Sequence, residues 1–135
     1  MLDLKGDDPA LPAALVDAFR EVRPTEELLV CSQNWVLLEQ FRPYIGVTLV
    51  HSIGDEQQLA LAWDRLARDD HDAVSIDYRL LSAARTQELK ARVSTVMSWT
   101  VNAELPFRAV LGWGVDGVIS DNLDMLRQFV ERRDR

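Results

Sequence analysis

The sequence predicts an α/β fold in which short buried strands alternate with amphipathic helices. The apolar runs are short and almost uninterrupted by polar residues, which is typical of strands covered on both faces of a sheet. The segments between these runs repeat apolar residues every three or four positions, which is typical of helices. The alternation recurs about six times without a linker or a low-complexity segment. We therefore expect a single domain over residues 1–135.

The first half of the chain supplies three predicted strands and two helices. The strands are expected at residues 2–4, 28–31 and 47–50. Apolar residues at helical spacing begin at Leu11, and Arg23-Pro24-Thr25 ends this first helix. Asn34 is a good N-cap for the second helix, which Pro43 closes.

The second half continues the same alternation. Strands are expected at residues 73–76, 96–102 and 114–121. Asp55 caps a helix that runs to about Arg68, and a further helix extends from the polar tip Asp77-Tyr78 to about Arg92. A helix over 103–113 joins the last two strands. A closing amphipathic helix carries the apolar residues Met125, Leu126, Phe129 and Val130.

Composition excludes several classes of function. The net charge is −7, and the basic residues are scattered among acidic ones except for Arg132-Arg133-Asp134-Arg135 at the end, so no basic stripe is available to bind nucleic acid. No apolar run approaches the roughly 20 residues of a membrane span, and residues 1–5 do not resemble a signal peptide. We expect a soluble, cytoplasmic protein. The single cysteine, Cys31, lies within an apolar run and is interpreted as a buried, unreactive thiol.

Polar residues follow the predicted strands, and in a parallel sheet these tips share one rim. Asn102 and Asp121 are the tips of the last two strands, and they either contact a ligand or cap the following helices, with capping favoured.

A doubly wound sheet and a barrel both fit the alternation. The doubly wound alternative has one feature in its favour, because Asp77 stands where the phosphoacceptor of a response-regulator receiver domain would. That chemistry also needs an early acidic pair, whereas Ser32-Gln33-Asn34 carries no acid.

Two motifs resemble the glycerophosphodiester phosphodiesterase family, whose fold is an eightfold α/β barrel. They are Trp99-Thr100-Val101-Asn102 and Gly114-Val115-Asp116-Gly117-Val118-Ile119-Ser120-Asp121, in the family's order and with a short helix between them. Further segments are similar to the family as well. These are Asp3-Leu4-Lys5, Ser32-Gln33, Trp35-Val36-Leu37-Leu38 and Asp77-Tyr78-Arg79-Leu80-Leu81. The resemblance therefore implies a partial TIM-type barrel of six parallel strand–helix units that lacks the first two.

The resemblance also implies a set of site residues. Asp3 takes the place of a metal-ligating glutamate, and Lys5 matches a catalytic lysine that contacts the substrate phosphate. Trp99 would line the substrate pocket, with Asn102 and Ser32 as further substrate-binding residues. The implied cofactor is a divalent cation, Mg²⁺ or Ca²⁺. A single carboxylate holds such a cation poorly, because these ions take several oxygen ligands at once.

The family's catalytic histidines have no counterpart here. Its His-Arg-Gly motif, its Glu-x-Asp motif and the following His-Asp pair are absent, and the two histidines, His51 and His71, lie in other contexts. His51 would end a strand at the rim, but a structural role is favoured for it. The implied reaction is metal-dependent hydrolysis of a glycerophosphodiester to glycerol phosphate and an alcohol, in lipid metabolism. We expect the chain to be inactive alone.

Two further expectations follow from an incomplete barrel. It leaves unpaired strand edges at residues 2–5 and 115–119, which favour pairing with another chain. We therefore expect a homo-oligomer or a complementing N-terminal segment as partner, beside a small glycerophosphodiester as substrate. A non-catalytic binding or assembly module built on the same scaffold is the alternative to an enzyme.

Overall fold

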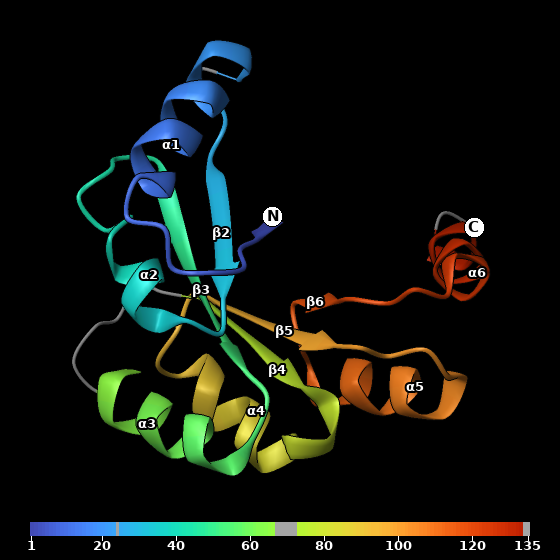
Figure 1. Ribbon diagram of the computed structural model, residues 1–135. Helices are drawn as coiled ribbons and strands as arrows, with labels where there is room; N and C mark the ends of the chain where they lie inside the picture. The colour runs from blue at the N-terminus through green and yellow to red at the C-terminus, as the bar shows by residue number, and fades with distance from the viewer. Residues whose placement is uncertain (24, 67–72, 134–135) are drawn as a thin grey trace. The chain divides into compact units, whose positions relative to one another are not determined.

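The computed structural model describes residues 1–23, 25–66 and 73–133 (Figure 1). Helices and strands alternate along the chain, as the sequence predicts. The chain divides into two compact units, Met1–Ser52 and Ile53–Arg135. Each unit is described by itself. No helix in the described ranges is long and apolar enough to cross a membrane.

The first unit is a three-stranded parallel sheet with two helices. Its strands are β1 (Leu2–Asp3), β2 (Leu28–Ser32) and β3 (Val47–Ile53), and its helices are α1 (Leu11–Val22) and α2 (Trp35–Glu39). Strand β2 lies between the other two, since Leu2 pairs with Val30 and Val30 pairs with Leu49. A receiver-type doubly wound sheet places its first strand between the second and third. The doubly wound alternative is therefore wrong.

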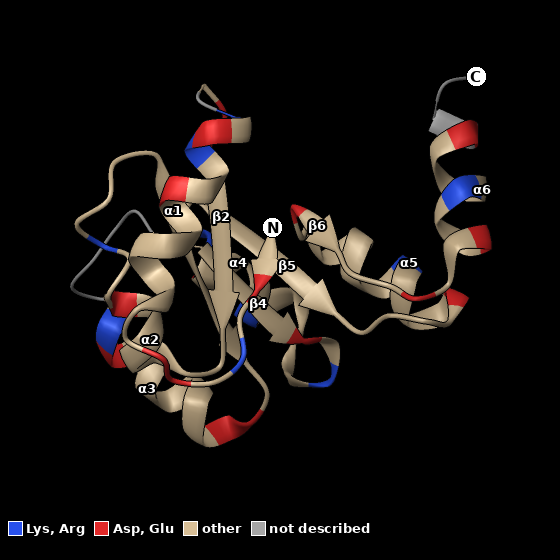
Figure 2. Ribbon diagram, turned by 45° about the horizontal axis from the view of Figure 1, so that its top comes forward, with Lys and Arg blue, Asp and Glu red and all other residues tan. Residues whose placement is uncertain are grey.

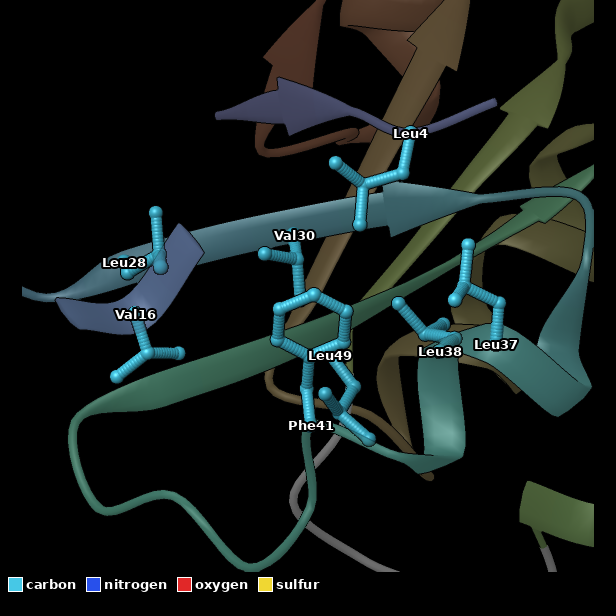
Figure 3. Close-up of a cluster of buried hydrophobic side chains, with 8 residues drawn as sticks. All are labelled: Leu4, Val16, Leu28, Val30, Leu37, Leu38, Phe41 and Leu49. Carbon is cyan, nitrogen blue, oxygen red and sulfur yellow. The ribbon is translucent and has the colours of Figure 1, made fainter. Parts of the chain in front are cut away.

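The core of the first unit lies between the sheet and its helices. Figure 3 shows the buried side chains Leu4, Val16, Leu28, Val30, Leu37, Leu38, Phe41 and Leu49. The strand residues among them alternate along the chain, so one face of the sheet packs against the helices. Asn34 caps α2 as predicted, because its side-chain oxygen accepts a hydrogen bond from the Leu37 amide.

The second unit is built in the same way. Its strands are β4 (Ala73–Asp77), β5 (Thr95–Trp99) and β6 (Gly117–Val118), all parallel, with β5 in the middle. Its helical segments are α3 (Glu56–Leu66), the 3₁₀ turn η1 (Tyr78–Leu80), α4 (Ala83–Lys90), α5 (Glu104–Trp113) and α6 (Leu123–Arg133). A core cluster of Val101, Phe107 and Val110 joins α5 to β6 and α6. Phe107 meets Phe129 of α6 edge to face, with the ring centroids 5.1 Å apart.

Several predicted boundaries differ from the observed ones. The helix after β4 begins at Ala83 rather than directly after Asp77-Tyr78, because η1 intervenes and Ser82 caps a new helix. Strand β3 continues through Ile53, so His51 lies within a strand. Strand β6 is limited to Gly117–Val118. Arg68 and His71 lie outside the described residues.

Candidate functional site

Trp99 is the last residue of β5, and the packing of the second unit fixes the face on which it lies. Val118 of β6 packs with the α5–α6 cluster, and Val118 pairs with Ser98. Paired residues of neighbouring strands share a face, and successive residues alternate between faces. Trp99 therefore lies on the face opposite α5 and α6. Trp99 also lies at the carboxyl end of its strand. In α/β barrels the sites form at the carboxyl ends of the strands.

The indole of Trp99 is held in place by a backbone hydrogen bond. Its Nε1–H donates to the carbonyl oxygen of Ser75 in β4 at 2.9 Å, and the residue is half-buried. Because the polar end of the ring is satisfied by a neighbouring strand, the rest of the ring has a defined orientation. Trp99 can thus offer a rigid apolar wall at the strand ends.

Asp77 ends β4 directly beside Trp99, with which it pairs across the sheet. The Asp77 carboxylate is buried at 4% exposure and accepts hydrogen bonds from the guanidinium of Arg79 and from its backbone amide. The hydrogen bond from the Arg79 side chain lowers the pKa of Asp77, although burial alone would raise it. Arg79 was not among the predicted site residues. Its signal in the sequence was an acidic residue at a strand end followed two positions later by an arginine.

Asn102 connects the loop after β5 to the loop after β6. Its side-chain oxygen accepts hydrogen bonds from the Ser120 hydroxyl (3.0 Å) and the Asp121 amide (2.9 Å). Its Nδ2–H donates to the Asp121 carboxylate at 3.2 Å. Neither Asn102 nor Asp121 caps a helix, so the favoured capping interpretation is wrong. Helix α5 begins after Ala103 without a side-chain cap, and the side-chain oxygen of Asn122 accepts a hydrogen bond from Met125 in the first turn of α6.

The first unit carries the remaining predicted site residues. Lys5 donates to the Asp3 carboxylate at 2.9 Å, and both side chains are exposed. Asp3 pairs with Cys31, so it lies on the sheet face opposite the one that carries Val30. Ser32 shares the face of Val30, toward the helices. Its hydroxyl is buried, donates to the Leu4 carbonyl and accepts from the Asn34 amide.

Asp3 does not by itself fit the divalent cation that the family resemblance implies. In the described ranges, no group of three or more His, Cys, Asp or Glu residues is placed to hold a metal ion. The ammonium group of Lys5 also occupies one oxygen of Asp3, and a cation there would face a like charge. Mg²⁺ and Ca²⁺ both take several oxygen ligands. Ligands from outside these residues would be required.

His51 packs against α2 in the first unit. Its ring meets Trp35 edge to face, with the centroids 5.3 Å apart, and its Nε2 lies 3.5 Å from a carboxylate oxygen of Glu39. The hydrogen bond from Arg42 is the main reason that the pKa of Glu39 is lowered, and His51 adds to the effect. His51 thus lies on the helix side of β3.

A cavity of about 560 Å³ in the second unit lies between α5 and α6. Its apolar lining consists of Phe107, Leu111, Met125 and Phe129. These residues lie on the helix side of the sheet, whereas Trp99 and Asp77 occupy the other face. Acidic and basic residues are interspersed along the ribbon (Figure 2). We place the candidate site of the second unit at the carboxyl ends of β4 and β5, where Asp77 and Trp99 are paired.

Comparison with known proteins relates part of the chain to one enzyme family. Residues 95–124, from β5 to the start of α6, match the model of the glycerophosphoryl diester phosphodiesterase family. This segment contains both motifs and the Asn102 network. The predicted family resemblance is confirmed. No curated protein matches the chain.

Solved structures of glycerophosphodiester phosphodiesterases show the fold. An Oleispira antarctica phosphodiesterase in complex with its product sn-glycerol-3-phosphate superposes with a TM-score of 0.74 at 18% identity, over 96% of this chain and 54% of that one. The Thermotoga maritima glycerophosphodiester phosphodiesterase gives a TM-score of 0.68 at 16% identity, over 96% and 57% of the two chains. The chain thus spans about half the length of these structures. The fold prediction, a partial TIM-type barrel of six parallel strand–helix units, is confirmed.

Proposed function

We propose that this chain forms the substrate-lining part of a glycerophosphodiester phosphodiesterase site. The observation that carries the proposal is the position of Trp99, fixed at the carboxyl end of β5 on the face opposite the helices. The Oleispira antarctica relative holds sn-glycerol-3-phosphate. This bound product supports a small glycerophosphodiester as the substrate class here. The apolar wall of Trp99 would pack against the carbon atoms of the glycerol or of the alcohol group.

The reaction would be hydrolysis of the phosphodiester to glycerol phosphate and an alcohol. Such a reaction needs one group to take a proton from water and another to give a proton to the leaving alcohol. Neither His51 nor His71 stands in the family's catalytic motifs. We therefore propose that the chain alone is inactive, and that histidines and metal-binding carboxylates come from a complementing N-terminal segment.

The predicted site residues divide by their contacts. Lys5 is exposed and suited to contact a phosphate, with Asp3 holding its ammonium group. Ser32 and Asn102 use most of their hydrogen-bonding capacity within the chain, which suits positioning better than direct contact. We propose a cytoplasmic role in glycerophosphodiester and lipid metabolism.

Titration of the purified chain with sn-glycerol 3-phosphate tests the proposal. In NMR spectra we expect the indole Nε1–H signal of Trp99 to shift, and that of Trp63 on α3 to stay in place. Trp99→Ala should weaken binding about tenfold, because a buried aromatic contact of this size is lost, whereas Trp63→Ala should not. We expect no hydrolysis of glycerophosphocholine. Two results would contradict the proposal: binding that leaves Trp99 unaffected, or turnover by the purified chain alone.

A further inference from the structure

The strand end beside Trp99 carries a guanidinium group fixed by a buried carboxylate. Arg79 Nε donates to both oxygens of Asp77, at 3.0 and 3.1 Å, and Nη2 donates to Oδ2. The Asp77 side chain is 5% exposed, whereas that of Arg79 is 73% exposed. Asp77 is therefore buried at the end of the sheet, and Arg79 is exposed to solvent while its guanidinium group is held by Asp77.

This pair differs from an ordinary surface ion pair. Arg108 and Glu104 on α5 show the ordinary case, in which both side chains are more than half exposed and one turn of helix separates them. Such pairs have little fixed geometry, because both side chains move. Asp77 cannot move in this way, since it also accepts a hydrogen bond from the Arg79 amide and so closes the turn η1.

The guanidinium group of Arg79 has N–H donors that Asp77 does not use and that can bind a ligand. It has five N–H groups in one plane, and Asp77 takes those of Nε and one of Nη2. Within the described part of the chain, Nη1 donates to no protein acceptor. Its N–H groups, together with the second one of Nη2, have the fork geometry that suits a phosphate.

The position of Arg79 matches the candidate site. Asp77 and Trp99 are paired residues at the carboxyl ends of β4 and β5, and both lie on the face opposite α5 and α6. A phosphate bound by Arg79 would therefore have the indole of Trp99 close by.

We propose that Arg79 binds the phosphate of the substrate, with Asp77 as its positioning residue. The inference rests on the proposed function, because it takes the phosphodiester as the ligand of this site. Anion binding by Arg79 can nevertheless be measured with inorganic phosphate, which carries no glycerol.

The test is a titration of the full chain with inorganic phosphate and with sn-glycerol 3-phosphate at constant ionic strength. Arginine Nε–Hε signals report each guanidinium by NMR. We expect the Arg79 signal to shift and saturate, and the Arg108 signal to change little. Arg79→Gln should weaken phosphate binding about tenfold, since a hydrogen-bonded charge is lost. The matched control Arg108→Gln should alter it by less than about twofold. Arg79→Lys should lie between them, because it keeps the charge and loses the fork.

The outcomes separate this inference from the proposed function. Equal binding of sn-glycerol 3-phosphate by the wild type and Arg79→Gln would overturn the role of Arg79 and leave the proposed function standing. Saturable phosphate binding at Arg79, without binding of sn-glycerol 3-phosphate or glycerophosphocholine, would support the anion site and overturn the proposed function. Signals of Arg79 and Arg108 that respond alike, without saturation, would overturn the inference. The wild-type titration decides the question even if Arg79→Gln does not fold.

Discussion

Polar side chains link β5 to β6 at both ends of these two strands. At its start, Asp116 accepts hydrogen bonds from the Val96 amide (2.9 Å) and from Lys90 (2.6 Å). Burial alone would raise the pKa of Asp116, but these hydrogen bonds outweigh it and the pKa is lowered. At the other end, Asn102 joins the two loops through Ser120 and Asp121. The polar residues of the two motifs therefore hold the strand ends in register, so that Trp99 stands in a rigid frame.

Asp77 should make the stability of the chain depend on acid pH. Its pKa in the folded state lies below the ordinary value of 3.8, so the stabilisation is fully present above about pH 4 and is lost as the pH falls through the folded-state pKa. Between pH 6 and pH 3 the free energy of unfolding should decrease in the wild type, and it should decrease less in Asp77→Asn. Urea denaturation of both proteins at both pH values measures this difference. Asp17→Asn, at an exposed position in α1, is the control. An unchanged pH dependence in Asp77→Asn would refute the prediction.

The site shows which residues a sequence can predict and which it cannot. The place of Trp99 at a strand end can be predicted, because its strand and its tip lie in one short motif. The fixed position of Arg79 cannot be predicted in this way, because it depends on the burial of Asp77, which arises only when β4 packs into the sheet. The capping interpretation of Asn102 failed for a similar reason. Its partners are 18 and 19 residues away and meet it only through the pairing of β5 with β6.

At the level of elements, apolar spacing predicted where helices exist better than where they begin. Leu80 and Leu81 fit the spacing of a helix, yet η1 ends before Ser82, which caps α4 through the Arg85 amide at 3.2 Å. A serine followed by a helix-forming run is a start signal in its own right. Helix α5 shows the corresponding stop signal, since Gly114 ends it in the left-handed conformation with φ of 88°.

Two glycines near the end of α5 should respond to alanine with opposite signs. Gly114→Ala should lower the free energy of unfolding by about 1 kcal/mol, because a residue with a Cβ is strained at positive φ. Gly112→Ala should raise it by about 0.5–1 kcal/mol, because Gly112 lies inside the helix and open space surrounds its Cβ position. Chemical denaturation of both variants measures the difference. Two changes of the same sign would show that the left-handed cap does not set the end of α5.

At the scale of the molecule, both units have an edge strand of only two residues. Among the described strands, β1 pairs with β2 alone and β6 with β5 alone. Parallel strands are normally covered on both faces, and in a closed barrel each strand is also paired on both sides. Because the chain spans about half the length of its solved relatives, these edges are the places where further strands would pair. We propose that the same edges pair with another copy of the chain.

Self-association through these edges should be weakened by a charge on β1. We expect the average mass of the purified chain, measured by light scattering, to rise with concentration. Leu2→Lys should reduce that rise, because a lysine on an edge strand opposes pairing with another strand. Leu61→Lys is the matched control, since Leu61 is an exposed leucine on α3, outside both edges. A constant monomer mass at every concentration would contradict self-association. A Leu2→Lys variant that associates like the wild type would place the contact elsewhere than β1.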